Sequence, residues 1–301
     1  MSKIVSVFGA TGSQGGAVVN SLLKDGTFKV RALTRNTQSQ SAKHLKSLGC
    51  EVVKCDVTDS KKEIEQALRG SYGVFLVTFS AFLFEKEAIY GKTVVDAALE
   101  AGVQHFVFSS LPNSKKITSG KIVIEEFDLK YEIEEYLRDI SKKNPSFKSS
   151  FVIPPFYMQN FDQANPLFTI RKNKDGNYYL EIAVDPKSKH PFDLIDINDM
   201  GPVVVEILKD PKKYSNLSIF LNGDALSSEQ ICEILSKETG KPIILQYIPP
   251  KEYEKVGNPI VAKMLDFCNN YGFDDNFTLA SKITKLTSFK EYLQKNTIHL
   301  K

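Results

Sequence analysis

The chain has no tryptophan and only four cysteines, four histidines and four methionines among its 301 residues. The cysteines stand at positions 50, 55, 232 and 268, without a Cys-x-x-Cys pair and without nearby histidine pairs. This spacing supplies neither the ligand set of a zinc site nor a disulfide framework, so we predict no metal. We expect a reduced intracellular compartment, the cytoplasm and also the nucleus.

A strong excess of charge of either sign is also missing. Lysine and arginine total 39 and aspartate and glutamate total 36, which gives a net charge of +3. A near-balanced chain has no strong attraction for DNA, RNA or anionic lipid. The apolar stretch 74–84 is well short of the roughly 20 residues of a membrane span, and Met1-Ser2-Lys3 lacks signal-peptide anatomy. We therefore expect no direct nucleic-acid binding and no membrane association.

What the first half does contain is an alternation of two periodicities. Short apolar runs alternate with stretches that have helical spacing. This order predicts βαβ units around a parallel sheet, and the absence of in–out alternation within the runs predicts a sheet covered on both faces. We predict an α/β fold, a Rossmann-type doubly wound parallel sheet with a smaller C-terminal α/β lobe. The expected strands are 4–8, 30–33, 51–53, 74–77 and 106–108, and the expected helices 17–23, 41–48, 62–68 and 88–101.

The length favours about two lobes at the usual ~150 residues per domain. A helix over 129–140 and a sixth strand at 151–153 complete the regular half, which Pro154-Pro155 ends. The second half predicts a hairpin around 175–177, a helix after Asp199 and another over 227–238. We predict an NAD(P)-binding Rossmann domain over 1–153 and a smaller, discontinuous lobe over 154–301 that exchanges segments with the first.

The first strand runs into a glycine-rich turn that a helix follows. Gly9 allows the sharp turn, Gly12 lets a pyrophosphate approach the backbone, and Gly15 lets the helix pack closely on the strand. The helix N-terminus adds N–H groups and a partial positive charge. The alternative is a tight turn without a ligand. We predict a phosphate site made of Gly9, Ala10, Thr11, Gly12, Ser13, Gln14 and Gly15.

The end of the second strand indicates which nicotinamide cofactor would bind. An NAD site usually places a carboxylate there to accept hydrogen bonds from the ribose 2′-hydroxyl, but this strand ends in Thr34-Arg35. A guanidinium can instead hold a 2′-phosphate in a bidentate fork. We therefore predict NADP(H), with Arg35, Asn36 and Thr37 forming the 2′-phosphate loop. The alternative is a solvated arginine after a strand.

Two further strand ends would face adenine and ribose at the same sheet edge. Asp56 and Val57 follow the third strand, and Thr78, Phe79 and Ser80 follow the fourth. Asp56 fits a cap of the following helix equally well.

The glycine spacing resembles the short-chain dehydrogenase/reductase superfamily, whose typical members carry a Tyr-x-x-x-Lys pair. Here Lys130 stands at the start of an amphipathic helix, but Glu126 occupies the place four residues before it. A carboxylate there makes a favourable helix pair and offers no phenolic proton. The alternative for Lys130 is a surface lysine paired with Glu126 or Glu134.

Over nearly its whole length the chain resembles the NmrA-like family, in particular its NADPH-sensor type. The resemblance is carried by 8–16, 34–36, 51–53, Gly120 with 127–130, 134–136 with 138–140, Tyr157 with Asn160, 194–201, and Pro249 with 253–255. It implies a Rossmann lobe, a smaller lobe and an NADP site in the cleft between them. By position it implies a nicotinamide side made of Thr78, Phe79, Ser80, Lys130, Tyr157, Met158, Gln159 and Asn160.

The resemblance also implies a regulator whose cofactor occupancy alters conformation, dimerisation or partner binding. We therefore expect a protein partner and a homodimer, and no catalytic residue. The alternative is an NADPH-dependent reductase of a quinone or small carbonyl compound, in which Lys130 donates the proton. A third reading is a scaffold with a vestigial site.

Overall fold

The computed structural model describes residues 2–162, 167–273, 278–298 and residue 300. The chain forms two compact units. The first contains Met1–Pro112, Glu125–Ile153 and Ile197–Ile219, and the second contains Asn113–Ile124, Pro154–Asp196 and Phe220–Lys301.

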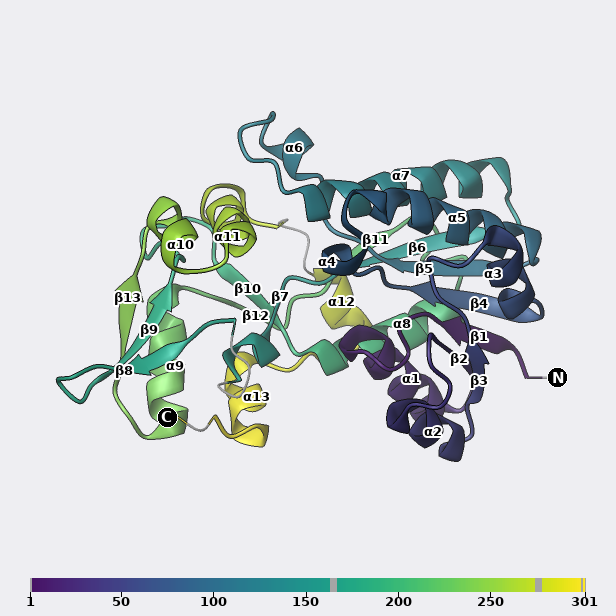
Figure 1. Cartoon of the computed structure of the whole chain (residues 1–301). Helices are drawn as coiled ribbons and strands as arrows, with labels where there is room; N and C mark the ends of the chain where they lie inside the picture. Colours follow the sequence, from purple (N-terminus) through teal and green to yellow (C-terminus); the bar gives the residue numbers. More distant parts are fainter. Residues whose placement is uncertain (1, 163–166, 274–277, 299, 301) are drawn as a thin grey trace. The chain divides into compact units, whose positions relative to one another are not determined.

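The first unit is built on a seven-stranded sheet with the order β11-β6-β5-β4-β1-β2-β3 (Figure 1). The strand pairs from β6 through β3 are parallel, which confirms the predicted doubly wound Rossmann-type sheet. The strand order reverses between β1 and β4, and ligands of such sheets bind at this switch point. The strands are β1 (Ile4–Val7), β2 (Lys29–Thr34), β3 (Glu51–Lys54), β4 (Ser71–Leu76), β5 (His105–Ser109), β6 (Lys148–Ile153) and β11 (Ser218–Phe220).

Helices cover both faces of this sheet (Figure 1). One face carries α1 (Ser13–Asp25), α2 (Gln40–Ser47) and α8 (Met200–Lys209), and the other carries α3 (Lys61–Leu68), α5 (Glu87–Glu100) and α7 (Glu125–Lys143). The central strands are buried on both sides, as their uninterrupted apolar runs predict.

Close helix packing fixes the layers beside the sheet. A Cβ at Gly201 of α8 would lie 2.2 Å from Ser21 Oγ and 2.3 Å from the Ala17 carbonyl of α1. A Cβ at Gly91 of α5 would lie 2.3 Å from Cδ1 of Ile133 on α7. Gly201 therefore lets α8 pack closely on α1, and Gly91 lets α5 pack closely on α7. The N-termini of α1 and α5 carry residues of the candidate site.

The second unit contains two three-stranded sheets, ordered β12-β10-β7 and β13-β9-β8. The predicted hairpin is confirmed, because β8 and β9 pair antiparallel around Gly176, which has a φ of 86°. A helix over 227–238 is also confirmed as α9, with a Ser227/Gln230 capping box at its start. The strands are β7 (Phe156–Tyr157), β8 (Ile170–Lys172), β9 (Tyr178–Ile182), β10 (Phe192–Ile195), β12 (Asp224–Leu226) and β13 (Ile243–Tyr247). The helices are α6 (Ser114–Ile117), α9 (Ser228–Thr239), α10 (Pro250–Val256), α11 (Pro259–Tyr271), α12 (Thr278–Ile283) and α13 (Phe289–Lys295).

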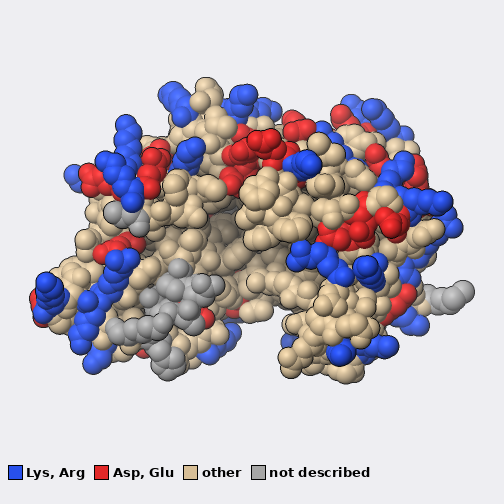
Figure 2. All heavy atoms as spheres, in the orientation of Figure 1, with Lys and Arg blue, Asp and Glu red and all other residues tan. Residues whose placement is uncertain are grey.

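Within the described residues, no helix is both long enough and apolar enough to cross a bilayer. On the face drawn in Figure 2, basic and acidic side chains are interspersed, in keeping with the near-balanced composition.

Candidate functional site

The glycine turn after β1 is the predicted phosphate site, and its backbone is closely constrained. Gly9 adopts a φ of 63°, which L side chains rarely tolerate, and its carbonyl accepts a hydrogen bond from Gly12 N at 2.8 Å. Helix α1 then begins at Ser13, with Gly12 at its N-cap and no side chain capping it. Its first turn contains no acidic residue. The positive end of the helix dipole is therefore not offset by a nearby carboxylate.

The glycines of the turn differ in what constrains them. A Cβ at Gly15 would lie 2.2 Å from the Gly9 carbonyl oxygen and 2.8 Å from the Phe8 carbonyl oxygen, so Gly15 is required by the fold itself. A Cβ at Gly12 would lie 3.3 Å from its nearest neighbour, the same Gly9 oxygen. The fold thus almost tolerates a side chain at Gly12, and its bareness leaves the backbone open to a ligand.

Arg35, directly after β2, presents a largely exposed guanidinium. Its side chain is 67% exposed, and its Nε lies 3.7 Å from Oδ2 of Asp56. Its guanidinium carbon also lies 5.0 Å from the ring centre of Phe82. The neighbouring Asn36 accepts a hydrogen bond from Gln38 N at 2.9 Å, which shapes the loop that Thr37 continues. The predicted 2′-phosphate arginine is thus accessible but held by two weak contacts.

Asp56 does not cap the following helix. Helix α3 is capped by Ser60 in a capping box with Glu63. Asp56 Oδ1 instead accepts hydrogen bonds from Thr58 N at 3.0 Å and Thr58 Oγ1 at 2.6 Å, while its other oxygen faces Arg35. The helix-cap reading of Asp56 is therefore wrong, and its neighbour Val57 packs against the core of the unit.

Lys130 lies inside the unit, not on its surface. It is 9% exposed, and its Nζ donates to the Thr78 carbonyl at 2.9 Å and to Thr78 Oγ1 at 2.8 Å. The third partner is the carboxylate of Glu87, at the first turn of α5 and fully buried. This contact ties α7, α5 and the end of β4 together. The alternative of a surface lysine paired with Glu126 or Glu134 is wrong, because Lys130 is buried and pairs with Glu87, while Glu134 pairs with Arg138.

Two effects act on the charge of Lys130. Burial lowers the pKa of its ammonium, and the carboxylates of Glu87 and Glu126 oppose that shift. Glu87 Oε2 is buried without a hydrogen-bond partner, so the carboxylate depends on Lys130 for its compensation. The site contains a lysine cation fixed in place rather than a phenol–lysine pair.

Past Thr78 the chain turns outward. Thr78 is 4% exposed, whereas Phe79 is 71% exposed, and Ser80 begins the short helix α4 (Ser80–Leu83). A 3-10 turn, η1 (Phe84–Lys86), connects α4 to α5. The side chain of Thr78 thus accepts a hydrogen bond from Lys130, and Phe79, directly after it, faces solvent.

The turn after β1, Arg35, Asp56 and Thr78 all follow carboxyl ends of parallel strands, so the sheet brings them to one edge. The other predicted nicotinamide residues, Tyr157, Met158, Gln159 and Asn160, belong to the second unit. Met158 is fully buried there. Gln159 Nε2 donates to Asp196 Oδ1 at 2.7 Å, and the Asn160 carbonyl accepts from Phe168 N at 3.1 Å.

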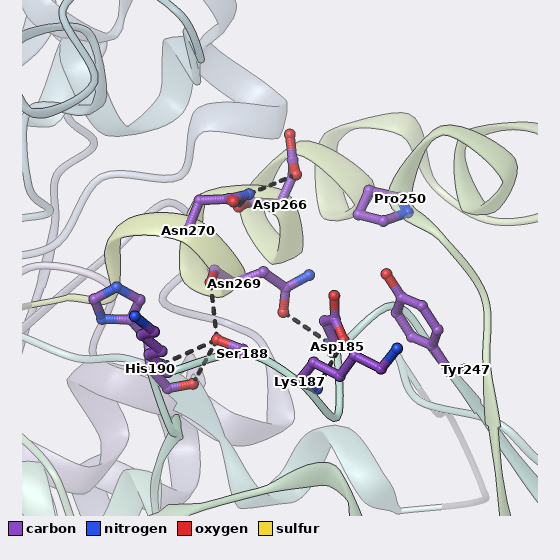
Figure 3. A pocket seen from close by; sticks show the side chains of 10 residues that line it. Asp185, Lys187, Ser188, His190, Tyr247, Pro250, Asp266, Asn269 and Asn270 are labelled. Carbon is purple, nitrogen blue, oxygen red and sulfur yellow. Dashed lines mark hydrogen bonds between the residues drawn. The ribbon is translucent and has the colours of Figure 1, made fainter.

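The second unit has a polar cavity of its own, of about 460 Å³ (Figure 3). Its polar groups largely bond to one another: Asn269 Oδ1 accepts from Asp185 N at 2.9 Å, and Ser188 Oγ donates to the Asn269 carbonyl at 2.8 Å. The lining residues are Asp185, Lys187, Ser188, Lys189, His190, Tyr247, Pro250, Asp266, Asn269 and Asn270. None of these belongs to the predicted cofactor residues.

Sequence reasoning missed two residues of the site edge, Glu87 and Phe82. Glu87 is the first residue of a helix that the sequence predicted from residue 88. An acidic residue in the first turn of a helix ordinarily interacts with the helix dipole, so its pairing with a distant lysine was not expected. Phe82 lay within an apolar run without helical or strand spacing. No local sequence pattern indicates the partner of either residue, because Lys130 lies 43 positions from Glu87 and Arg35 lies 47 positions from Phe82.

Comparison with known proteins agrees with this architecture. Residues 1–293 match the model of the NmrA-like family. An NmrA-like family domain-containing protein of Dictyostelium discoideum is 45% identical over 300 residues, which cover 98% of each chain. An NmrA-like family domain-containing oxidoreductase of Aspergillus hancockii is 35% identical over 252 residues, 80% of this chain and 73% of the relative.

Two solved structures share the fold at lower identity. NmrA, a negative transcriptional regulator, in complex with NADP matches with a TM-score of 0.82 at 22% identity, covering 98% of this chain and 96% of that one. The NADPH-dependent quinone oxidoreductase of Escherichia coli, complexed with NADPH, matches with a TM-score of 0.77 at 20% identity, covering 97% and 99%. The family match over nearly all of the sequence, together with these relatives, shows that the chain belongs to the NmrA-like family, as its motifs predicted.

Proposed function

We propose that this protein binds NADP(H) and that cofactor occupancy, rather than steady turnover, is its output through a change of conformation or of partner binding. The observation that carries the proposal is the set of buried contacts made by the ammonium group of Lys130. Its ammonium is committed to Glu87 and Thr78, and Glu126 stands where a proton-transferring tyrosine would be.

The residues present fit a phosphorylated dinucleotide. Gly12 leaves the backbone open to a pyrophosphate, and the uncapped N-terminus of α1 offers positive charge to it. Arg35 is exposed and can give a 2′-phosphate a bidentate fork, and the strand end beside it carries no carboxylate that would prefer a 2′-hydroxyl. The NADP complex of the similarly folded NmrA supports this assignment.

The regulatory part of the proposal follows from linkage. A cofactor that binds one conformation better than another shifts the population toward it. A second protein, or a second copy of this chain, that binds only one of the two conformations then responds to the change in population. The described cysteines are all free and buried, in keeping with a reduced compartment such as the cytoplasm or nucleus.

Calorimetric titration with NADP⁺, NADPH, NAD⁺ and NADH tests the binding. We expect saturable binding of the phosphorylated forms, weaker binding of the others, and a melting temperature that rises with NADP(H) concentration. Absence of heat and of stabilisation with every form would overturn the proposal.

A second candidate function is an NADPH-dependent reductase of a quinone or a small carbonyl compound. The oxidoreductase names of several relatives and the fold of the quinone oxidoreductase favour it. The bound cofactor would supply a hydride, and Lys130 would have to leave Glu87 to give a proton to the substrate oxygen. NADPH oxidation against a quinone and aldehyde panel tests this, with the double variant Lys130→Met/Glu87→Gln as control, because Lys130→Met alone leaves the Glu87 carboxylate buried without a partner. Turnover that disappears in the variant would establish the reductase over the sensor.

A further inference from the structure

A contact between Arg35 and Phe82 crosses the carboxyl end of β1. Arg35 follows β2 and Phe82 belongs to α4 after β4, and β1 lies between β2 and β4 in the sheet. The guanidinium carbon of Arg35 lies 5.0 Å from the ring centre of Phe82, within cation–π range. The pair therefore bridges the two strands that flank the glycine turn.

The segment that carries Phe82 is exposed and strained. Phe79 and Phe84 are each 71% exposed and Phe82 is 51% exposed, whereas Leu83 is the one buried side chain within α4. Phe84 has a φ of 49° and a ψ of −143°, a conformation that costs free energy for any residue other than glycine. Segments with little buried surface and stored strain change conformation readily.

We propose that Phe82 and Asp56 hold Arg35 when no 2′-phosphate is bound, and that the 2′-phosphate of NADP(H) withdraws the guanidinium from both and so releases the aromatic segment 79–86. This inference rests on the proposed NADP(H) binding. It makes Phe82 and Asp56 determinants of cofactor specificity and makes segment 79–86 the part of the first unit that reports the phosphorylated cofactor.

The charges support an exchange of partners. Arg35 meets Asp56 at 3.7 Å with a largely exposed side chain, so this ion pair contributes little by itself. A dianionic phosphate offers a stronger, bidentate partner than one carboxylate and an aromatic face. NAD(H) presents a hydroxyl at the same place and has no charge with which to draw Arg35 away.

Affinity measurements on Phe82→Leu test the competition. Loss of an exposed cation–π contact corresponds to about 0.5–1 kcal/mol, so NADP⁺ affinity should rise about two- to fivefold. NAD⁺ affinity should stay the same, which separates an effect on Arg35 from an effect on the shared adenosine part. Phe84→Leu in the same segment is the matched control and should change neither affinity. A fall in NADP⁺ affinity of Phe82→Leu, or an equal change for NAD⁺, would overturn the inference.

A single-tryptophan reporter tests the release directly, because the chain has no tryptophan of its own. Phe82→Trp keeps an aromatic face for Arg35, and we expect its emission to shift on saturation with NADP⁺ but not with NAD⁺. Leu48→Trp, at the exposed end of α2, is the control for a change of the whole unit and should not respond. An unchanged Phe82→Trp spectrum in protein that calorimetry shows to be saturated with NADP⁺ contradicts the release while leaving the binding proposal intact.

Discussion

Glu87 and Lys130 form a buried ion pair between the first turn of α5 and the first half of α7, and the lysine also binds both oxygens of Thr78. Both side chains are nearly inaccessible, at 0% and 11% exposure. A buried pair of this kind contributes little net stability, but losing one partner leaves an uncompensated charge in the interior. The stability of the protein should therefore fall when either residue of the pair is replaced alone, and should change little when both charges are removed together.

Glu87→Gln should destabilise the protein by about 3 kcal/mol, the usual cost of breaking a buried pair. Without this carboxylate, only the weaker attraction of Glu126 opposes the effect of burial, so the pKa of Lys130 falls further below 10.5. A lowered lysine pKa in the folded protein reduces stability only at pH values where Lys130 is protonated in the unfolded chain. The loss of stability in Glu87→Gln should therefore become smaller as the pH rises toward 10.5. Urea unfolding at several pH values measures it. The double variant Glu87→Gln/Lys130→Met should recover most of the stability, and no recovery would contradict the pairing.

Alanine substitutions at two glycines of the turn should separate folding from binding. Gly15→Ala places a Cβ against the backbone of Gly9 and should cost about 1–3 kcal/mol through overpacking. Gly12→Ala meets its nearest atom at 3.3 Å, so the melting temperature should change little, whereas NADP⁺ affinity should fall because the methyl group occupies the approach of the pyrophosphate. Thermal unfolding with and without NADP⁺ distinguishes the two. Equal cofactor stabilisation of Gly12→Ala and the unchanged protein would argue against a phosphate cradle at this turn.

Arg35→Gln should abolish the preference for the phosphorylated cofactor. Charge-assisted hydrogen bonds contribute about 1.5–3 kcal/mol, so NADP⁺ affinity should fall by roughly ten- to a hundredfold. NAD⁺ affinity should stay nearly constant, since that cofactor has no 2′-phosphate. Parallel calorimetric titrations give both values. A comparable loss for both cofactors would assign Arg35 a role in the fold of the loop instead.

The sheet and the cofactor turn follow from local sequence because each rests on short-range physics. Apolar runs of strand length, glycines at 9, 12 and 15, and the arginine directly after β2 are all readable within a few residues. The same holds for helix α9, whose Ser227/Gln230 capping box and Gly240 stop lie at its own ends.

The environment of Lys130 could not be read in this way. Its register in an amphipathic helix is compatible with both a surface and a buried position, and Glu126, the acid four residues before it, is not its hydrogen-bond partner. The partner that decides its burial lies on another helix, and only the packing of α5 against α7 brings the two together. Likewise, the sequence left open whether Asp56 caps the following helix, and in the structure Ser60 has that role.

His105 makes the stability of the first unit depend on pH. It is fully buried at the start of β5, and its Nε2 lies 2.9 Å from Ser150 Oγ. Ser150 donates its own proton to the Tyr214 carbonyl at 2.8 Å, so its oxygen accepts from His105 Nε2–H. The other ring nitrogen, Nδ1, is buried without a partner. Protonation would therefore place a charge where nothing accepts the added hydrogen, and burial lowers the pKa of His105 from 6.5 to about 4.

Because the unfolded chain binds the proton more tightly than the folded one, His105 contributes its full stability above pH 6.5 and loses it as pH falls toward 4. The difference in pKa corresponds to a loss of about 3 kcal/mol across that window. Urea unfolding between these pH values should show this decline in the unchanged protein. His105→Gln should be less stable at neutral pH, but its free energy of unfolding should fall less as the pH is lowered from 6.5 to 4. Parallel curves for the two proteins would show that the acid sensitivity has its origin in other groups, because the substitution removes only the imidazole.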